Sequence, residues 1–125
     1  MEKIIFIAAW AGIVLGFLVG SAMGLRFYDP QWLGGYASWP RRMLRLGHLC
    51  LVALPLLNLV SLFFLAQFHL AGSSVNVLLG LLLVGQVSMP LVCFLSAYKL
   101  RFRYLFPVPV VSLIAAAVGL LYLAL

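Results

Sequence analysis

Acidic residues are almost absent from this sequence: Glu2 and Asp29 are the only two among its 125 residues. Charged residues of both signs make up 8% of the chain, whereas a soluble globular domain carries roughly 25%. Apart from Glu2 at one edge, no carboxylate falls within a long apolar run. Proton-coupled transport normally depends on a carboxylate inside the membrane, so the composition argues against that function.

Cysteine is equally scarce, since Cys50 and Cys93 are the only two. They form no CxxC pair, so the sequence encodes neither a redox motif nor a zinc site, and we expect each to be a small buried apolar residue. The sequence also lacks a Ser/His/Asp or Cys/His arrangement, paired carboxylates and a Gly-rich phosphate loop. We therefore predict that the protein is not an enzyme.

Apolar residues occupy 66% of all positions, and a water-soluble fold of this size could not bury so much apolar surface. A bilayer core about 30 Å thick is crossed by roughly 20 apolar residues in a helix. The first apolar run is longer than that of a typical signal peptide, so we expect it to be a retained span. The sequence predicts one all-α membrane domain, residues 1–125, with spans at about 4–25, 44–68, 75–98 and 106–125.

Basic residues gather in two of the connections between these spans. The connection at 26–43, together with Arg45, carries four arginines and one aspartate, a net charge of +3. The connection at 99–105 carries one lysine and two arginines, again +3, and the whole chain carries +6. The positive-inside rule places both connections in the cytoplasm. We therefore predict a bundle of four antiparallel transmembrane helices with N-out and C-out topology, in a bacterial inner membrane.

These basic residues lie within a turn or two of the spans, where anionic lipid headgroups are the nearest counter-charges. Nucleic-acid binding needs a basic surface on a soluble domain, so we do not expect it. The predicted headgroup contacts are Arg41, Arg42, Arg45, Lys99, Arg101 and Arg103.

Glycine recurs every fourth residue in the first span, at Gly12, Gly16, Gly20 and Gly24. This spacing places the glycines along one helix face, where a second helix can approach closely, so it predicts a helix-packing site. The sequence leaves open whether the partner helix belongs to this chain, to a second copy or to another protein.

Three neutral polar residues, Asn58, Gln86 and Ser88, lie deep in the second and third spans. An amide at this depth most often bonds to another helix, so interhelical packing is the first interpretation and a solute pathway is the second. Pro55 and Pro90 lie nearby, and each can free a carbonyl and bend its helix.

His48 lies just inside the second span and shares a helix face with Pro55. One interpretation is a histidine at headgroup level that bonds to a neighbour, and the other is a haem ligand, a quinone contact or a proton relay. His69 cannot complete the same site, because about 21 residues of helix separate the two by roughly 30 Å. If the second and third spans pair about their short turn, His48 should lie at the depth of Cys93 and Phe94. We expect no metal, and no cofactor unless His48 holds haem or quinone.

Three functions agree with this pattern. The first is a non-catalytic accessory subunit that stabilises a larger membrane complex, for example in energy conversion, by helix packing. The second is an electron-transfer protein that binds haem or quinone at His48. The third is a small homo-oligomeric channel or carrier lined by Asn58, Gln86 and Ser88. The expected partners are other membrane subunits or further copies of the chain.

Overall fold

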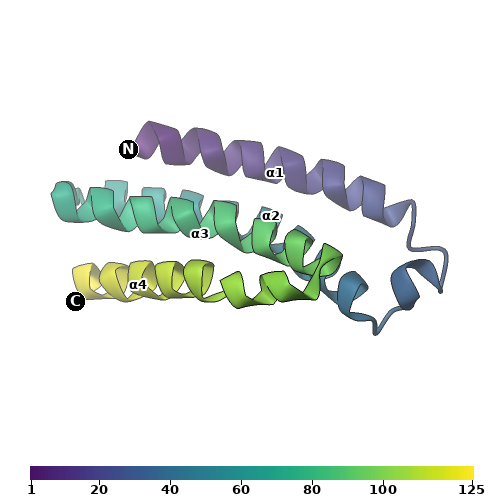
Figure 1. The fold of residues 1–125 in the computed structure, drawn as a ribbon. Helices are drawn as coiled ribbons and strands as arrows, with labels where there is room; N and C mark the ends of the chain where they lie inside the picture. The colour runs from purple at the N-terminus through teal and green to yellow at the C-terminus, as the bar shows by residue number, and fades with distance from the viewer.

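The computed structural model describes residues 1–125 as four long helices joined by short segments (Figure 1). All four helices are long and apolar enough to cross a membrane, which confirms the predicted helical class and the predicted number of long apolar helices. The helices are α1 (Glu2–Gly24), α2 (Trp39–Gln67), α3 (Ser73–Tyr98) and α4 (Pro107–Ala124), with short 3-10 helices η1 (Trp32–Gly34) and η2 (Leu100–Leu105).

Helix α2 begins at Trp39, before the start predicted from the apolar run. The Ser38 side chain caps it by accepting a hydrogen bond from the Arg41 backbone N–H at 3.4 Å. Pro40 lies in the first turn, where its missing N–H costs nothing. Local capping therefore extends the helix through its basic residues, beyond the point where hydropathy alone would start it.

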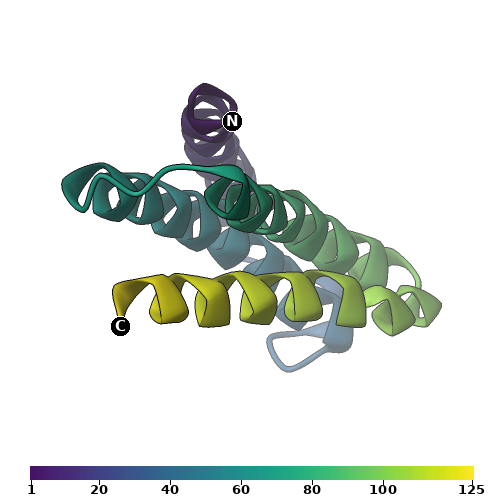
Figure 2. The same ribbon diagram turned by 90° about the vertical axis from the view of Figure 1, so that its left-hand side faces the viewer.

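The helices are arranged in three layers. Helices α2 and α3 form the middle layer and make the most extensive contact in the molecule. Helix α1 lies on one side of this pair, mainly against α2, and α4 lies on the opposite side against α3 (Figures 1 and 2). No contact joins α1 to α4 or α2 to α4. Each outer helix therefore has one principal neighbour.

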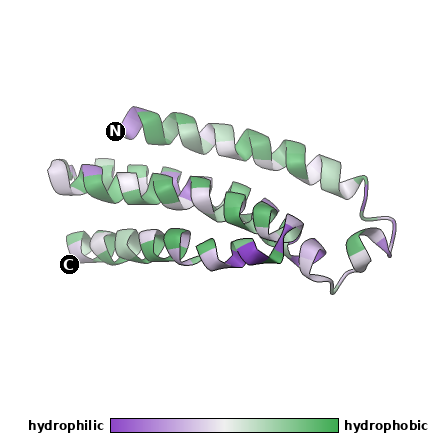
Figure 3. Ribbon diagram, in the orientation of Figure 1, coloured by the Kyte–Doolittle hydropathy of each residue, from purple (hydrophilic) through white to green (hydrophobic).

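Both basic connections lie at one end of the molecule. The two termini and the turn between α2 and α3 lie at the other end (Figure 1). Hydrophilic residues are concentrated around the basic connections, whereas the shafts of the helices are mostly hydrophobic (Figure 3). The two groups of positive charge thus occupy the same end, as the charge pattern requires.

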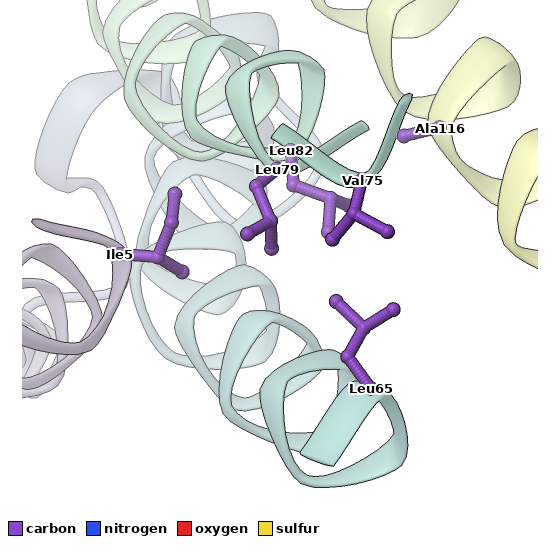
Figure 4. Packing of buried hydrophobic residues seen from close by; sticks show 6 residues of the cluster. All are labelled: Ile5, Leu65, Val75, Leu79, Leu82 and Ala116. Carbon is purple, nitrogen blue, oxygen red and sulfur yellow. The ribbon is translucent and has the colours of Figure 1, made fainter. Parts of the chain in front are cut away.

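A small apolar core holds the layers together near the termini (Figure 4). Every helix contributes to it, and α3 provides half of its members. The core residues are Ile5 of α1, Leu65 of α2, Val75, Leu79 and Leu82 of α3, and Ala116 of α4. The central position of α3 explains its share, because α3 is the helix that touches all three others.

At the opposite end, the middle layer is held closely together at Gly47 of α2. A β-carbon added there would lie 3.1 Å from Cβ of Cys93 and 2.8 Å from the Phe94 ring. This places His48, the next residue, at the depth of Cys93 and Phe94. The pairing of α2 with α3 therefore has the register predicted from their short connecting turn.

Candidate functional site

The glycine face of α1 packs against α2 of the same chain. A β-carbon added at Gly12 would lie 2.7 Å from Cγ of Pro55, and one at Gly16 would lie 2.7 Å from Cγ2 of Val52. Both distances are too short for a real side chain, so only glycine allows this approach. The structure thereby provides an internal partner for this face, which the sequence had left open.

The last two glycines of this face, Gly20 and Gly24, differ from each other in what lies against them. A β-carbon at Gly20 would lie 2.6 Å from Cε1 of His48, whereas one at Gly24 would meet nothing within 4 Å. Of the four predicted packing glycines, three therefore face α2. Gly24 lies beyond the interface.

His48 occupies the interface between α1 and α2, and its imidazole lies against Gly20. His48 and Pro55 both face the α1 glycines, as their predicted shared face requires. The Nδ1 atom of His48 is buried and has no hydrogen-bond partner. His69 is exposed at the far end of α2, and no cluster of three or more histidine, cysteine, aspartate or glutamate residues is present. The imidazole thus fills a packing position between α1 and α2.

A chain of hydrogen bonds joins three helices at the depth of the predicted polar residues. Asn58 of α2 donates from Nδ2 to Oε1 of Gln86 of α3 at 2.5 Å. Gln86 then donates from Nε2 to the backbone carbonyl of Ala8 in α1 at 2.7 Å. Asn58 is 1% exposed and Gln86 is 6% exposed. The two amides therefore form bonds between helices, which was the first interpretation of amides so deep in the predicted spans.

Ser88 belongs to a different arrangement from the two amides. Its hydroxyl donates to the Val84 carbonyl one turn earlier on its own helix. Ser61 makes the same bond to Leu57 in α2. A hydroxyl that bonds within its own helix needs no partner from elsewhere, so Ser88 lies outside the interhelical chain.

The prolines of the middle layer lie beside this chain. Pro55 has no N–H to donate to the Leu51 carbonyl, and Pro90 has none for the Gln86 carbonyl. The Leu51 carbonyl oxygen faces the glycine groove, 3.4 Å from a β-carbon built at Gly16. Because the glycines of α1 have no side chains, their Cα–H groups lie close to the Leu51 carbonyl, which Pro55 leaves without a hydrogen bond inside α2. Such Cα–H contacts to carbonyls are typical of helix interfaces.

A cavity of about 310 Å³ opens between α1, α2 and α3 at the same depth. Its wall is mostly apolar, and Gln86 supplies its polar side chain. Gly12, Leu51, Pro55 and Pro90 form part of the wall. This arrangement suits an apolar molecule with one hydrogen-bonding group better than a strongly hydrated ion.

Arg41 differs from the headgroup contact that we predicted for it. The residue is 4% exposed, and its guanidinium donates to the backbone carbonyls of Phe27, Asp29 and Pro30 at 3.2 Å each. Its Cζ also lies 4.9 Å from the centre of the Phe27 ring. Arg41 therefore holds the α1–α2 connection in place and is turned away from the surface.

Arg45 supports the same connection one turn later. It donates to the Tyr36 carbonyl at 2.9 Å, and its guanidinium lies 4.0 Å from the centre of the Tyr36 ring. The other basic residues of the predicted set are exposed and remain available to lipid headgroups: Arg42, Lys99, Arg101 and Arg103.

Sequence reasoning missed the structural role of Arg41, although a signal for it was present. Arginine is favoured where a flat cation stacks on aromatic rings, and the connection contains Phe27 and Trp32. The Arg41 guanidinium lies 5.9 Å from the centre of the Trp32 ring. The position of Arg41 in the first turn of a helix that follows an aromatic loop could thus have predicted its contact with that loop.

Comparisons with protein-family models, with curated proteins and with solved structures find no match for this chain. The class of protein therefore rests on its own geometry. It is an all-helical chain whose four long helices have the length and composition of membrane spans.

Proposed function

We propose that this chain is inserted in a membrane as four antiparallel helices, N-out and C-out, and serves as a non-catalytic subunit of a larger membrane complex. The observation that carries the proposal is the layered arrangement, in which α1 and α4 each have one principal neighbour. Both outer helices therefore keep a long face free for contact with helices of other subunits.

The outward face of α1 supports this proposal. Phe6, Trp10 and Phe17 are each at least half exposed, and the Phe6 and Trp10 rings lie 6.4 Å apart in an edge-to-face arrangement. Aromatic side chains bury a large area with little loss of conformational freedom, which suits a packing surface. In contrast, the amides of the interior bond to one another, and the outward faces of α1 and α4 carry many exposed apolar side chains.

The glycines of α1 are not part of this docking surface, because Gly12, Gly16 and Gly20 are used inside the chain. A substitution at these glycines would act first on the fold of the subunit. The proposed docking residues are instead the large apolar side chains on the outward faces of α1 and α4.

The test is the native mass of the tagged protein after extraction in mild detergent, with the accompanying polypeptides identified. We expect a particle much heavier than a few copies of the chain, with other polypeptides at fixed ratio. Replacing both Phe6 and Trp10 with alanine should release those polypeptides while leaving the thermal stability of the chain unchanged. A particle that contains only this chain would contradict the proposal.

A carrier for a small apolar molecule is the second candidate, and the cavity beside Gln86 is the observation that favours it. The matched variants are Gln86→Leu, which removes the polar group of the cavity, and Ser88→Ala, which removes a hydroxyl bonded to its own helix. Flux in liposomes that falls only with Gln86→Leu would support a carrier. Equal flux in both variants and in the unaltered protein would exclude it.

A further inference from the structure

The only two cysteines of the chain meet across the middle layer. Cys50 belongs to α2 and Cys93 to α3, and their thiols are direct neighbours. Cys50 is 8% exposed, Cys93 is fully buried, and both are free thiols. Neither residue takes part in the hydrogen-bond chain of Asn58 and Gln86 or lies against the glycines of α1, so the pair is a separate feature of the structure.

Gly47 is the reason that the two thiols can come together. It lies three residues before Cys50, on the same side of α2, and a β-carbon there would lie 3.1 Å from Cβ of Cys93. The β-carbons of a disulfide are separated by about 3.5–4.5 Å. The two helices thus approach closely one helical turn from Cys50, on the side of α2 that Gly47 and Cys50 share.

We infer that Cys50 and Cys93 form a cross-helix dithiol that a lipid-soluble quinone oxidises to a disulfide between α2 and α3. In this reaction the two S–H bonds break and one S–S bond forms. Two electrons and two protons pass to the quinone, which becomes the quinol, so no other reactant is required. An excess of a small dithiol restores both thiols by thiol–disulfide exchange, in which the dithiol is itself oxidised to a disulfide.

The position of the pair suits an oxidant that arrives from the lipid. The two cysteines lie within the long apolar helices, and Cys50 keeps a small exposed fraction of 8%. The disulfide would fix the register of the middle layer, against which both α1 and α4 pack. This inference rests on the proposed insertion of the chain in a membrane, and it does not depend on the proposed role as a subunit.

The test uses the unaltered full-length protein in liposomes treated with tetramethylbenzoquinone, a fully substituted quinone that cannot add to thiols. Free thiols are then counted by maleimide labelling after denaturation, and the cross-linked peptides are identified by mass spectrometry. We expect loss of both thiols, one link between Cys50 and Cys93 of the same chain, and recovery of both thiols with dithiothreitol.

Two single variants provide the control. In Cys50→Ser and in Cys93→Ser the remaining thiol should stay fully labelled after the same treatment, because it has no partner in its own chain. The inference is overturned if both thiols of the unaltered protein remain free. It is also overturned if the links that form join different chains.

Discussion

At the scale of single residues, several buried polar side chains are held by specific partners in other segments. Asn58, Gln86 and the Ala8 carbonyl form one chain across three helices, and Arg41 is bound by three carbonyls of the α1–α2 connection. An unpaired polar group buried in an apolar environment costs about 1–3 kcal/mol. These partners therefore determine which residues can be replaced without loss of stability.

The bond between Asn58 and Gln86 should appear as coupling between the two positions. We expect Asn58→Leu and Gln86→Leu to destabilise the protein singly, and the double variant to lose less than their sum. Interhelical bonds of this kind contribute about 0.6 kcal/mol on average and up to about 1.7 kcal/mol. The free energy of unfolding in bicelles, measured for the unaltered protein, both single variants and the double variant, gives this coupling as a double-mutant cycle.

Ser88→Ala is the control for that cycle, because the Ser88 hydroxyl bonds within α3. It should show no coupling to Asn58→Leu. Strictly additive losses for Asn58→Leu and Gln86→Leu would contradict the bond between the amides.

Arg41 should be needed to hold the α1–α2 connection. Arg41→Lys keeps the charge and loses the planar set of donors, and each hydrogen bond from a charged group contributes about 1.5–3 kcal/mol. We expect chymotrypsin to cleave faster at Tyr28 and Tyr36, which are exposed in the connection. The exposed neighbour Arg42 supplies the matched variant Arg42→Lys, for which the cleavage rate should not change. Equal rates in both variants would disprove the role of Arg41.

At the scale of helices, the α1–α2 interface depends on side chains that are absent. Gly12, Gly16 and Gly20 bring the backbone of α1 close to α2, and no β-carbon fits at these positions without movement of a neighbour. In the proposed membrane setting, lipid would provide no hydrophobic force between apolar helices, so close packing of this kind would be a main source of their attraction.

Gly16→Ala should weaken this interface, because the added methyl group meets Cγ2 of Val52. Overpacking of this kind costs about 1–3 kcal/mol. Gly24→Ala is the matched control, since the same methyl group there meets nothing within 4 Å. Thermal unfolding in detergent, followed by circular dichroism, measures both variants.

A second substitution should identify the cause of the loss. Val52→Ala removes the atom that the new methyl group meets, so the double variant Gly16→Ala with Val52→Ala should recover part of the lost stability. If the double variant is less stable than Gly16→Ala alone, steric conflict with Val52 is not the reason.

The sequence predicted the helices well and their contacts unevenly. The four long helices followed from the lengths of the apolar runs, the shared face of His48 and Pro55 followed from helix periodicity, and the interhelical use of Asn58 and Gln86 followed from the cost of unpaired amides. The early start of α2 did not, because it depends on capping by Ser38 and not on hydropathy. The burial of Arg41 did not, because it depends on how the 25–38 segment folds back onto α2. The meeting of Cys50 with Cys93 depends on the rotation of two helices about their axes, which nearly uniform hydrophobicity does not specify.

At the scale of the whole molecule, the fold brings the positively charged connections together at one polar end. The basic connections share that end, and the termini share the other. Five exposed cations lie there, Arg26, Arg42, Lys99, Arg101 and Arg103, as contact with anionic headgroups would require.

Reporter fusions should establish the orientation of this end. With N-out and C-out topology, alkaline phosphatase fused to the C-terminus should be active in a bacterial host, and green fluorescent protein at the same position should be dark. Fusions within the η2 segment should give the opposite pair of results. A fluorescent C-terminal fusion would place the basic connections outside the cytoplasm and contradict the proposed topology.

The three-layer arrangement also bears on how the protein is made. Each helix packs mainly on the helix that precedes or follows it in the chain, and no contact joins the first helix to the last. Nascent chains emerge in sequence order, and structures rich in contacts between sequence neighbours fold fast. Helix α1 can therefore dock as soon as α2 follows it, and the α2–α3 hairpin can close before α4 has left the ribosome. The order of synthesis is then also the order of assembly. No helix of the partly synthesised chain has to wait for its main packing partner beyond the next helix to be made.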